Sequence, residues 1–269
     1  MSQLVSSHKF SYSQLSTYKV CPQQYKIIYL DGIRKYDESI EAFMGKRVHE
    51  VLDWLYSADN LNRPYFTFDS LCQQYDSKWI EKWHENIYIV DRKNETDFYY
   101  NIGKRCLSNY YSKYGPSFNQ SVEATELKLE FKVGNYLFKG IIDRLDQIDT
   151  GEWTVHDYKT SKYQKSKLQA SNDIQLALYK IAVEQNFSNI KNIYLTWHFL
   201  RMGNEVTIQQ TNQKLEILQK KIINLVEKII SSINKKNGML PKESILCNWC
   251  YLWQECSAKV GRNPVRKAK

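Results

Sequence analysis

The chain has 269 residues, of which 42% are hydrophobic and 25% charged, so it can bury a sizeable core and has the composition of a soluble globular protein. No apolar run reaches the length of a membrane span and no signal peptide is recognisable, so we expect a cytoplasmic protein. The net charge of +9 favours a polyanionic partner, although a basic composition alone does not establish one.

The first third of the chain has helical patterns. Ser11-x-x-Gln14 resembles a capping box that opens a short helix, and Pro22 suits the first turn of the next helix. Three longer amphipathic helices, rich in aromatic residues, are expected over 38–57, 68–86 and about 95–114.

The middle of the chain changes to strand patterns. Alternating segments around the turns Gly134-Asn135 and Thr150-Gly151 predict a three-stranded meander. A helix at about 172–186, strands at 192–200 and 204–210 and a long helix at about 211–235 should follow. We therefore predict an α/β fold, with a helical elaboration at about 58–120 inserted before a core at about 121–210.

Two carboxylates and a lysine should meet at the ends of paired strands. The strand period of two puts Asp157 and Lys159 on one face, and Gly140-Ile141-Ile142-Asp143 ends another apolar run upstream. An acid and a lysine are costly to bury unpaired, and a divalent metal with a scissile phosphate would satisfy both. The alternative is a surface salt bridge at a strand end.

Helical pairs at i, i+4 spacing lie on both sides of this triplet. Gly45 and His49 share one helix face, where the glycine permits close backbone approach and the imidazole could bind a metal. Gln175 and Tyr179 repeat the spacing on the helix after Lys159, where they could hold a phosphate or orient the lysine. Taken singly, a packed histidine and a polar stripe are the simpler interpretations.

Taken together and in this order, these residues resemble the RecB-like branch of the PD-(D/E)xK nuclease superfamily. The family pattern is G-x-x-x-H on a helix, G-x-x-D on a strand, (D/E)-x-K on the next and Q-x-x-x-Y on a helix. It is matched by Gly45–His49, Gly140–Asp143, Asp157-Tyr158-Lys159 and Gln175–Tyr179. The resemblance implies a restriction-endonuclease-like core, with a mixed central sheet flanked by helices, in a single nuclease domain over 1–258. The last eleven residues, 259–269, carry five cations and no acid and are expected to form a basic tail.

The resemblance also implies a role for each site residue. His49, Asp143 and Asp157 would ligate Mg²⁺ or Mn²⁺, with the Tyr158 carbonyl as a further ligand, and the histidine favours Mn²⁺. Lys159 would orient or help deprotonate the attacking water and offset developing charge.

Gln175 and Tyr179 would support Lys159 and the substrate backbone. Glu126 is a further acidic candidate near the metal, with Glu123 and Glu130 competing for that position.

Four cysteines form a one-plus-three pattern. Cys247-x₂-Cys250-x₅-Cys256 follows the long helix and Cys21 lies far upstream, so four thiolates could tie the two ends of the chain together. The same arrangement occurs in iron–sulfur members of the family, including AddB-type helicase-nucleases and CRISPR-associated nucleases. The resemblance therefore implies a structural [4Fe–4S] cluster, with zinc or ordinary buried thiols as alternatives. Cys72 and Cys106 are expected in the core.

The leading functional hypothesis is a metal-dependent DNA nuclease, an exonuclease that prefers single strands or free ends. Aromatic residues interleaved with cations suit unpaired bases, although core packing is the simpler account of most of these rings. A noncatalytic nucleic-acid-binding subunit and an iron–sulfur electron-transfer protein are the alternatives. The chain has no Walker motif, so it supplies no ATP-driven helicase of its own and is either a stand-alone nuclease or one subunit of a larger machine, for which helicase or CRISPR-adaptation proteins are the candidate partners. DNA repair, spacer acquisition in antiviral defence and mobile-element biology all stay open.

Overall fold

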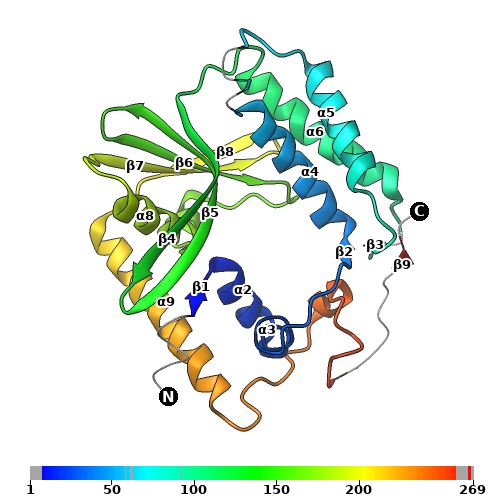
Figure 1. Ribbon diagram of the computed structural model, residues 1–269, viewed down its shortest axis with the longest axis vertical. Helices are drawn as coiled ribbons and strands as arrows, with labels where there is room; N and C mark the ends of the chain where they lie inside the picture. The colour runs from blue at the N-terminus through cyan, green and yellow to red at the C-terminus, as the bar shows by residue number, and fades with distance from the viewer. Residues whose placement is uncertain (1–7, 58, 61–62, 92, 259–265, 268–269) are drawn as a thin grey trace.

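A six-stranded mixed sheet with helices on both faces forms the centre of the molecule (Figure 1). The structure is a computed structural model that describes residues 8–57, 59–60, 63–91, 93–258 and 266–267. The strand order is β1-β5-β6-β7-β8, and β4 pairs with β5. These strands are β1 (Lys9–Phe10), β4 (Val122–Val133), β5 (Tyr136–Asp149), β6 (Glu152–Lys159), β7 (Asn192–Phe199) and β8 (Asn204–Ile208).

The predicted meander is confirmed as β4, β5 and β6. Its two turns contain Gly134 (φ +58°) and Gly151 (φ +82°), and this left-handed conformation favours glycine. β6 then pairs in parallel with β7, which pairs antiparallel with β8, so the sheet is mixed.

One stretch of β5 has a neighbour on a single edge. β1 pairs with Leu137 and Phe138, and the ladder with β6 begins only at Arg144. Between these contacts, residues 139–142 pair with β4 alone. Asp143 thus lies where β5 and β6 separate, and side chains can enter the space between the two strands.

The two faces of the sheet carry different helices. The hydrophobic core on one face joins Trp153, Val155 and Leu195 to α8 (Ile174–Asn186) and α9 (Asn212–Ile233). A second core contains Tyr158 and Leu200 and is built from the helical elaboration. Its helices are α4 (Ile40–Leu55), α5 (Phe68–Lys82) and α6 (Thr96–Tyr114). Most rings of α5 and α6 fill this core, as expected, including Tyr75, Trp79, Tyr99 and Tyr110.

Shorter elements complete the chain. α2 (Tyr12–Val20) begins where predicted, because the Ser11 hydroxyl accepts a hydrogen bond from the Gln14 N–H. The next expected helix is α3 (Pro22–Tyr25) continued as the π-helix η1 (Lys26–Leu30). Three further elements are α7 (Lys167–Ser171), the 3-10 helix η2 (Ile245–Trp249) and a small sheet of β2 (Glu38–Ser39), β3 (Ile87–Ile89) and β9 (Arg266–Lys267).

The expected basic tail is described only in part. Arg266–Lys267 pair with β3, and residues 259–265 and 268–269 lie outside the described residues. None of the described helices combines the length and the apolar character needed to cross a membrane.

Candidate active site

Asp157 and Lys159 end strand β6 and meet two side chains of α8. Lys159 Nζ lies 2.5 Å from Asp157 Oδ2 and donates to Gln175 Oε1 at 3.1 Å. The Gln175 amide and the Tyr179 hydroxyl both donate to Asp157 Oδ1, at 3.1 and 3.2 Å. The i, i+4 spacing of α8 therefore places an amide and a phenol on one carboxylate.

The start of α8 is fixed by its N-cap. Asp173 Oδ1 accepts hydrogen bonds from the Gln175 and Leu176 N–H groups at 2.8 and 3.3 Å. The cap sets where the helix begins and hence the position of Gln175 against β6.

Asp143 and His49 meet at the peptide of Tyr158. The Tyr158 N–H donates to Asp143 Oδ2 at 2.7 Å, replacing the ladder bond that is lost where the strands separate. His49 Nδ1 lies 3.6 Å from Asp143 Oδ1, and His49 Nε2 lies 3.1 Å from the Tyr158 carbonyl oxygen. Gly45 brings α4 close to the sheet, since a Cβ there would lie 3.0 Å from Thr160 Oγ1.

Glu126 is the third member of this group. One ligand atom each from His49, Glu126 and Asp143 lie within 4.8 Å of one another. Glu126 has φ +45°, an uncommon conformation for a residue inside a strand, and its neighbours pair with Ile142 and Arg144. The local backbone turn thus places a carboxylate opposite Asp143. An imidazole and two carboxylates are a donor set that fits a divalent cation such as Mn²⁺.

The opposite charges of Asp143 and His49 shift the pKa values of both residues. Burial would raise the pKa of Asp143, but His49 and the Tyr158 N–H hold it below its usual value. Burial would likewise lower the pKa of His49, but the charge and hydrogen bond of Asp143 raise it.

The pKa values of the other three titratable site residues, Asp157, Glu126 and Lys159, are all raised. Burial raises the pKa of Asp157 to about 6, Asp143 adds to the shift and Lys159 opposes it. Partial desolvation and then the charge of Asp143 raise the pKa of Glu126. Burial would lower the pKa of Lys159, but Asp157 raises it, so the lysine stays protonated. Crowded carboxylates of this kind are typical of functional sites, and a bound cation would relieve them.

The structure thus brings together all the predicted site residues, in two linked groups. Asp157, Lys159, Gln175 and Tyr179 form one, and His49, Asp143 and the Tyr158 peptide form the other, with Glu126 added. The hairpin register could have selected Glu126 over Glu123 and Glu130. A two-residue turn at Gly134-Asn135 pairs Val133 with Tyr136, and the same register carried back brings position 126 opposite 143.

Sequence reasoning named Glu126 as a candidate but missed Tyr12 of α2. Burial raises the pKa of this phenol, and the charges of Asp173, Lys159 and Asp157 act on it as well. α2 therefore reaches the lysine side of the site.

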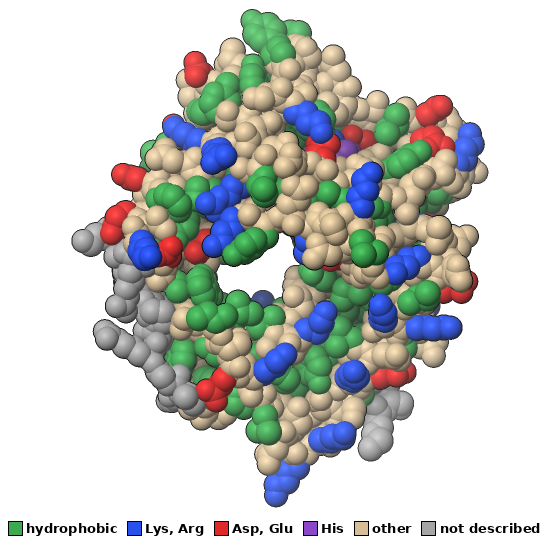
Figure 2. Space-filling view, turned by 180° about the vertical axis from the view of Figure 1, so that it is seen from behind, with side chains coloured by type: hydrophobic (Ala, Val, Ile, Leu, Met, Phe, Trp, Pro, Cys, Tyr) green, Lys and Arg blue, Asp and Glu red, His purple; other side chains and the backbone are tan. Residues whose placement is uncertain are grey.

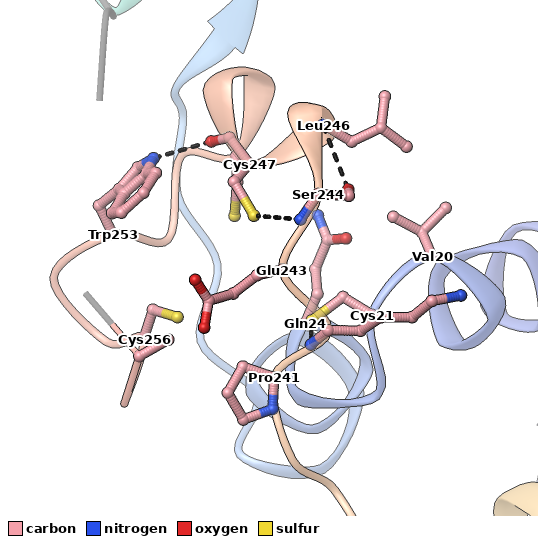
Figure 3. A pocket seen from close by; sticks show the side chains of 13 residues that line it. Val20, Cys21, Gln24, Pro241, Glu243, Ser244, Leu246, Cys247, Trp253 and Cys256 are labelled. Atoms are coloured by element: carbon pink, nitrogen blue, oxygen red, sulfur yellow. Dashed lines mark hydrogen bonds between the residues drawn. The ribbon is translucent and has the colours of Figure 1, made fainter. Parts of the chain in front are cut away.

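The four cysteines of the one-plus-three pattern line one pocket (Figure 3). Cys21 comes from the junction of α2 and α3, and the other three from the tail around η2. Burial raises the pKa of Cys250, and its three cysteine neighbours raise it further. Among the described residues, His49, Glu126 and Asp143 form the one group of three that is close enough to hold a metal ion, and the cysteines form no such group. The exposed Glu243 side chain reaches between Cys247 and Cys256 (Figure 3).

Two contacts help to hold the tail against the rest of the chain. Lys242 N–H donates to Cys21 Sγ at 3.4 Å, and Lys35 Nζ lies 2.8 Å from a Glu255 carboxylate oxygen. Cys72 and Cys106 lie apart from the pocket; Cys106 is buried in the core, as expected, and Cys72 is half-buried on α5.

Comparison with known proteins places this site in a family. The model of the PD-(D/E)XK nuclease superfamily matches residues 9–257. The chain belongs to the PD-(D/E)XK nuclease superfamily. This fold implies phosphodiester hydrolysis, and nucleases of this superfamily use divalent metal ions, for which His49, Glu126 and Asp143 offer a site.

One of two similar solved structures supports the fold. A proposed exonuclease from Eubacterium rectale superposes with a TM-score of 0.51 at 13% identity, over 94% of this chain and 90% of that one. The structure of SSO0001 gives a TM-score of 0.36 at 17% identity, over 93% and 94%. No curated protein matches the chain. The restriction-endonuclease-like fold predicted from the sequence is confirmed.

Proposed function

We propose that the protein is a metal-dependent DNA nuclease that hydrolyses single strands from free ends. The observation that carries the proposal is the juxtaposition of His49, Glu126 and Asp143 with the protonated Lys159. A site for a divalent cation thus lies beside a fixed positive charge, and both are what a phosphodiester transition state requires.

The chain's own residues would divide the work. His49, Glu126 and Asp143 would hold Mg²⁺ or Mn²⁺, with Asp157 and the Tyr158 carbonyl as neighbouring oxygens. When bound, the cation supplies Lewis-acid activation of water and phosphate. Burial would lower the pKa of Lys159 but Asp157 raises it, and the ammonium group would donate a hydrogen bond to the phosphate or the attacking water and stabilise negative charge. Gln175 and Tyr179 would keep Asp157 and Lys159 in place.

The preference for single strands rests on shape and charge. Figure 2 shows an opening through the molecule with Lys, Arg and hydrophobic side chains around it. Cations that follow phosphates and rings that stack on bases are the usual means of holding unpaired nucleic acid, and the chain carries a net charge of +9.

Cleavage of labelled DNA tests the proposal. Single strands labelled at the 5′ or the 3′ end and a closed single-stranded circle are incubated with Mn²⁺. We expect both linear strands to be degraded and the circle to survive. Lys159→Ala should lower the rate by about a hundredfold or more, whereas Lys167→Ala, an exposed lysine of α7, should not change it. Binding without cleavage by the unaltered protein would indicate a noncatalytic module instead.

We also propose a structural [4Fe–4S] cluster on Cys21, Cys247, Cys250 and Cys256. The four cysteines line one pocket, and four thiolates are the ligand set of a [4Fe–4S] cluster as well as of a structural zinc ion, so the metal content distinguishes the two. Anaerobically purified protein should be brown and contain about four iron atoms per chain. Colourless protein with one zinc per chain would contradict the cluster. Cys250→Ala should lower the iron content, and Cys72→Ala, the control, should not.

A further inference from the structure

A large groove begins directly beyond Lys159. It is open to solvent, has a volume of about 810 Å³ and is walled by the N-terminal halves of α4 and α6, the segment 160–163 and part of η2. Thr160 and Ser161, the residues after Lys159, form the wall nearest the site.

Three aromatic side chains in the groove are accessible. The exposed fractions are 71% for Tyr163, 42% for Phe98 and 38% for Trp249. They come from three separate parts of the chain, and Trp249 is held there by hydrogen bonds on both sides. Its indole N–H lies 3.5 Å from Glu41 Oε1, and its carbonyl accepts from the Tyr88 hydroxyl at 2.8 Å. The tail thus delivers a ring to a surface that the nuclease core does not provide.

The same groove contains two cations, Lys162 and Arg201. Within the described part of the chain, neither Lys162 nor Arg201 forms an ion pair. Lys162 Nζ lies over the Tyr163 ring at 5.2 Å from its centre. An unpaired cation beside an exposed ring can bind a phosphate while the ring stacks on the adjoining base.

The groove also has an acidic side. Asp91 and Glu41 line it; the Asp91 carboxylate accepts hydrogen bonds from the Lys93 N–H and the Asn94 amide. These carboxylates would repel phosphates. The phosphates should therefore follow Lys162 and Arg201, and the bases should face the rings.

We propose that this groove binds the unpaired nucleotides of the substrate strand next to the scissile phosphate, with bases on Tyr163, Phe98 and Trp249 and phosphates on Lys162 and Arg201. The inference rests on the proposed nuclease function and adds the residues that select single strands. A duplex end keeps its bases paired and stacked on one another, so it cannot use the rings in this way.

Binding to full-length Lys159→Ala protein tests the groove without turnover. Fluorescence anisotropy follows a labelled oligothymidylate and the same strand annealed to its complement, in EDTA. Adding Tyr163→Ala or Phe98→Leu should weaken single-strand binding about tenfold each and leave duplex binding unchanged. Tyr65→Ala, another exposed tyrosine at 63%, lies outside the groove and should bind normally. Lys162→Gln should lower the slope of log affinity against log salt by about 0.7, and Lys220→Gln on α9 should not.

Position-specific cross-linking gives a second reading. Irradiation of a 5-iodouracil-substituted strand should join it to Tyr163 or Trp249. If Tyr163→Ala and Phe98→Leu bind single strands as tightly as Tyr65→Ala does, or if the cross-links form only on other surfaces, the groove does not bind the strand. Either result would leave the nuclease proposal intact. An unaltered protein that neither binds nor cleaves DNA would instead overturn the nuclease proposal itself.

Discussion

The two faces of strand β6 carry two polar clusters with opposite properties. On the α8 face, Asp157 and Lys159 join Asp143 and Glu126, where carboxylates crowd one another and the pKa of Asp157 rises to about 6. On the α6 face, His156 and Tyr158 join the fully buried Arg144, which bonds to Asp146, Tyr110 and His156. The first cluster is a site that a cation would complete, so we call the α8 face of β6 the open face. The second cluster has all its charges paired, so we call it the closed cluster and the α6 face the closed face.

The closed cluster runs as a chain of paired groups. Asp146 Oδ2 lies 3.0 Å from His156 Nε2, His156 Nδ1 is 2.7 Å from His198 Nε2, and His198 Nδ1 is 2.8 Å from Glu205 Oε1. Lys113 and Tyr114 of α6 also bond to Glu205. Each charge has an opposite charge or a donor beside it. The difference teaches that a buried polar cluster indicates function when like charges stay unrelieved, and a structural role when they are matched.

Removing the central charge of the closed cluster should have the largest effect. Arg144→Met leaves the buried Asp146 carboxylate with only His156 beside it, which should lower the free energy of unfolding by about 3–5 kcal/mol. Urea denaturation measures the loss. Arg144→Met combined with Asp146→Leu removes both charges and should recover part of it. A loss below about 1 kcal/mol for Arg144→Met would mean that the network does not hold the sheet to α6.

Acidification should change the free energy of unfolding in opposite directions through the two faces of β6. Burial, and then the charge of Arg144, lowers the pKa of His156 to about 4. Between the ordinary pKa of about 6.5 and this value, the unfolded chain binds a proton that the folded chain does not, so stability falls on acidification by roughly 3 kcal/mol. Asp157, with its pKa raised to about 6, binds its proton more readily when folded and adds a gain of similar size below that pH.

Single variants separate these contributions. Unfolding free energies are measured at pH 6.5 and 4.5 in EDTA. Asp157→Asn lacks the carboxylate that stabilises the folded protein on protonation, so acid should lower its unfolding free energy more than that of the unaltered protein. His156→Gln lacks the imidazole whose protonation destabilises the folded protein, so acid should lower its unfolding free energy less. Equal pH dependence in the two variants would contradict the assignment of opposite signs to the two faces.

Loss of the α8 N-cap should lower the free energy of unfolding by a smaller amount and should also slow catalysis on the open face. Asp173→Ala removes the acceptor for the Gln175 and Leu176 N–H groups and should lower the unfolding free energy by about 1 kcal/mol. Because Gln175 contacts Lys159 and Asp157, DNA cleavage should also slow. Asp173→Asn keeps the cap but loses the ion pair to Lys165, so it serves as the matched control. Equal stability of the two variants would exclude the cap as the cause.

Much of the open face could be predicted because its parts are local patterns. The strand period places Asp157 with Lys159, helical spacing places Gln175 with Tyr179 and Gly45 with His49, and a two-residue turn fixes the register of β4 and β5. The same register predicts that Arg144 faces away from Asp143. These rules give the face of each side chain from sequence separation alone.

The closed face and the groove could not be predicted in this way. Arg144, His198 and Tyr110 come from β5, β7 and α6, and their contact depends on how the helical elaboration packs against the sheet. β2, β3 and β9 are two or three residues long, too short for a period to be recognised. Trp249 reaches the groove only because the tail folds back beside α4, and no local pattern encodes that return.

Glu126→Gln tests the central claim most directly, because it should move stability and metal binding in opposite directions. Desolvation and Asp143 raise the pKa of Glu126, so its charge disfavours the folded metal-free protein, and the neutral amide should leave the unfolding free energy at pH 7 equal or higher. Mn²⁺ affinity, measured by calorimetry, should fall at least about tenfold, with Glu123→Gln on the same strand unchanged. Unchanged Mn²⁺ affinity together with lower stability would contradict the account, because Glu126 would then belong to the structure and not to the site.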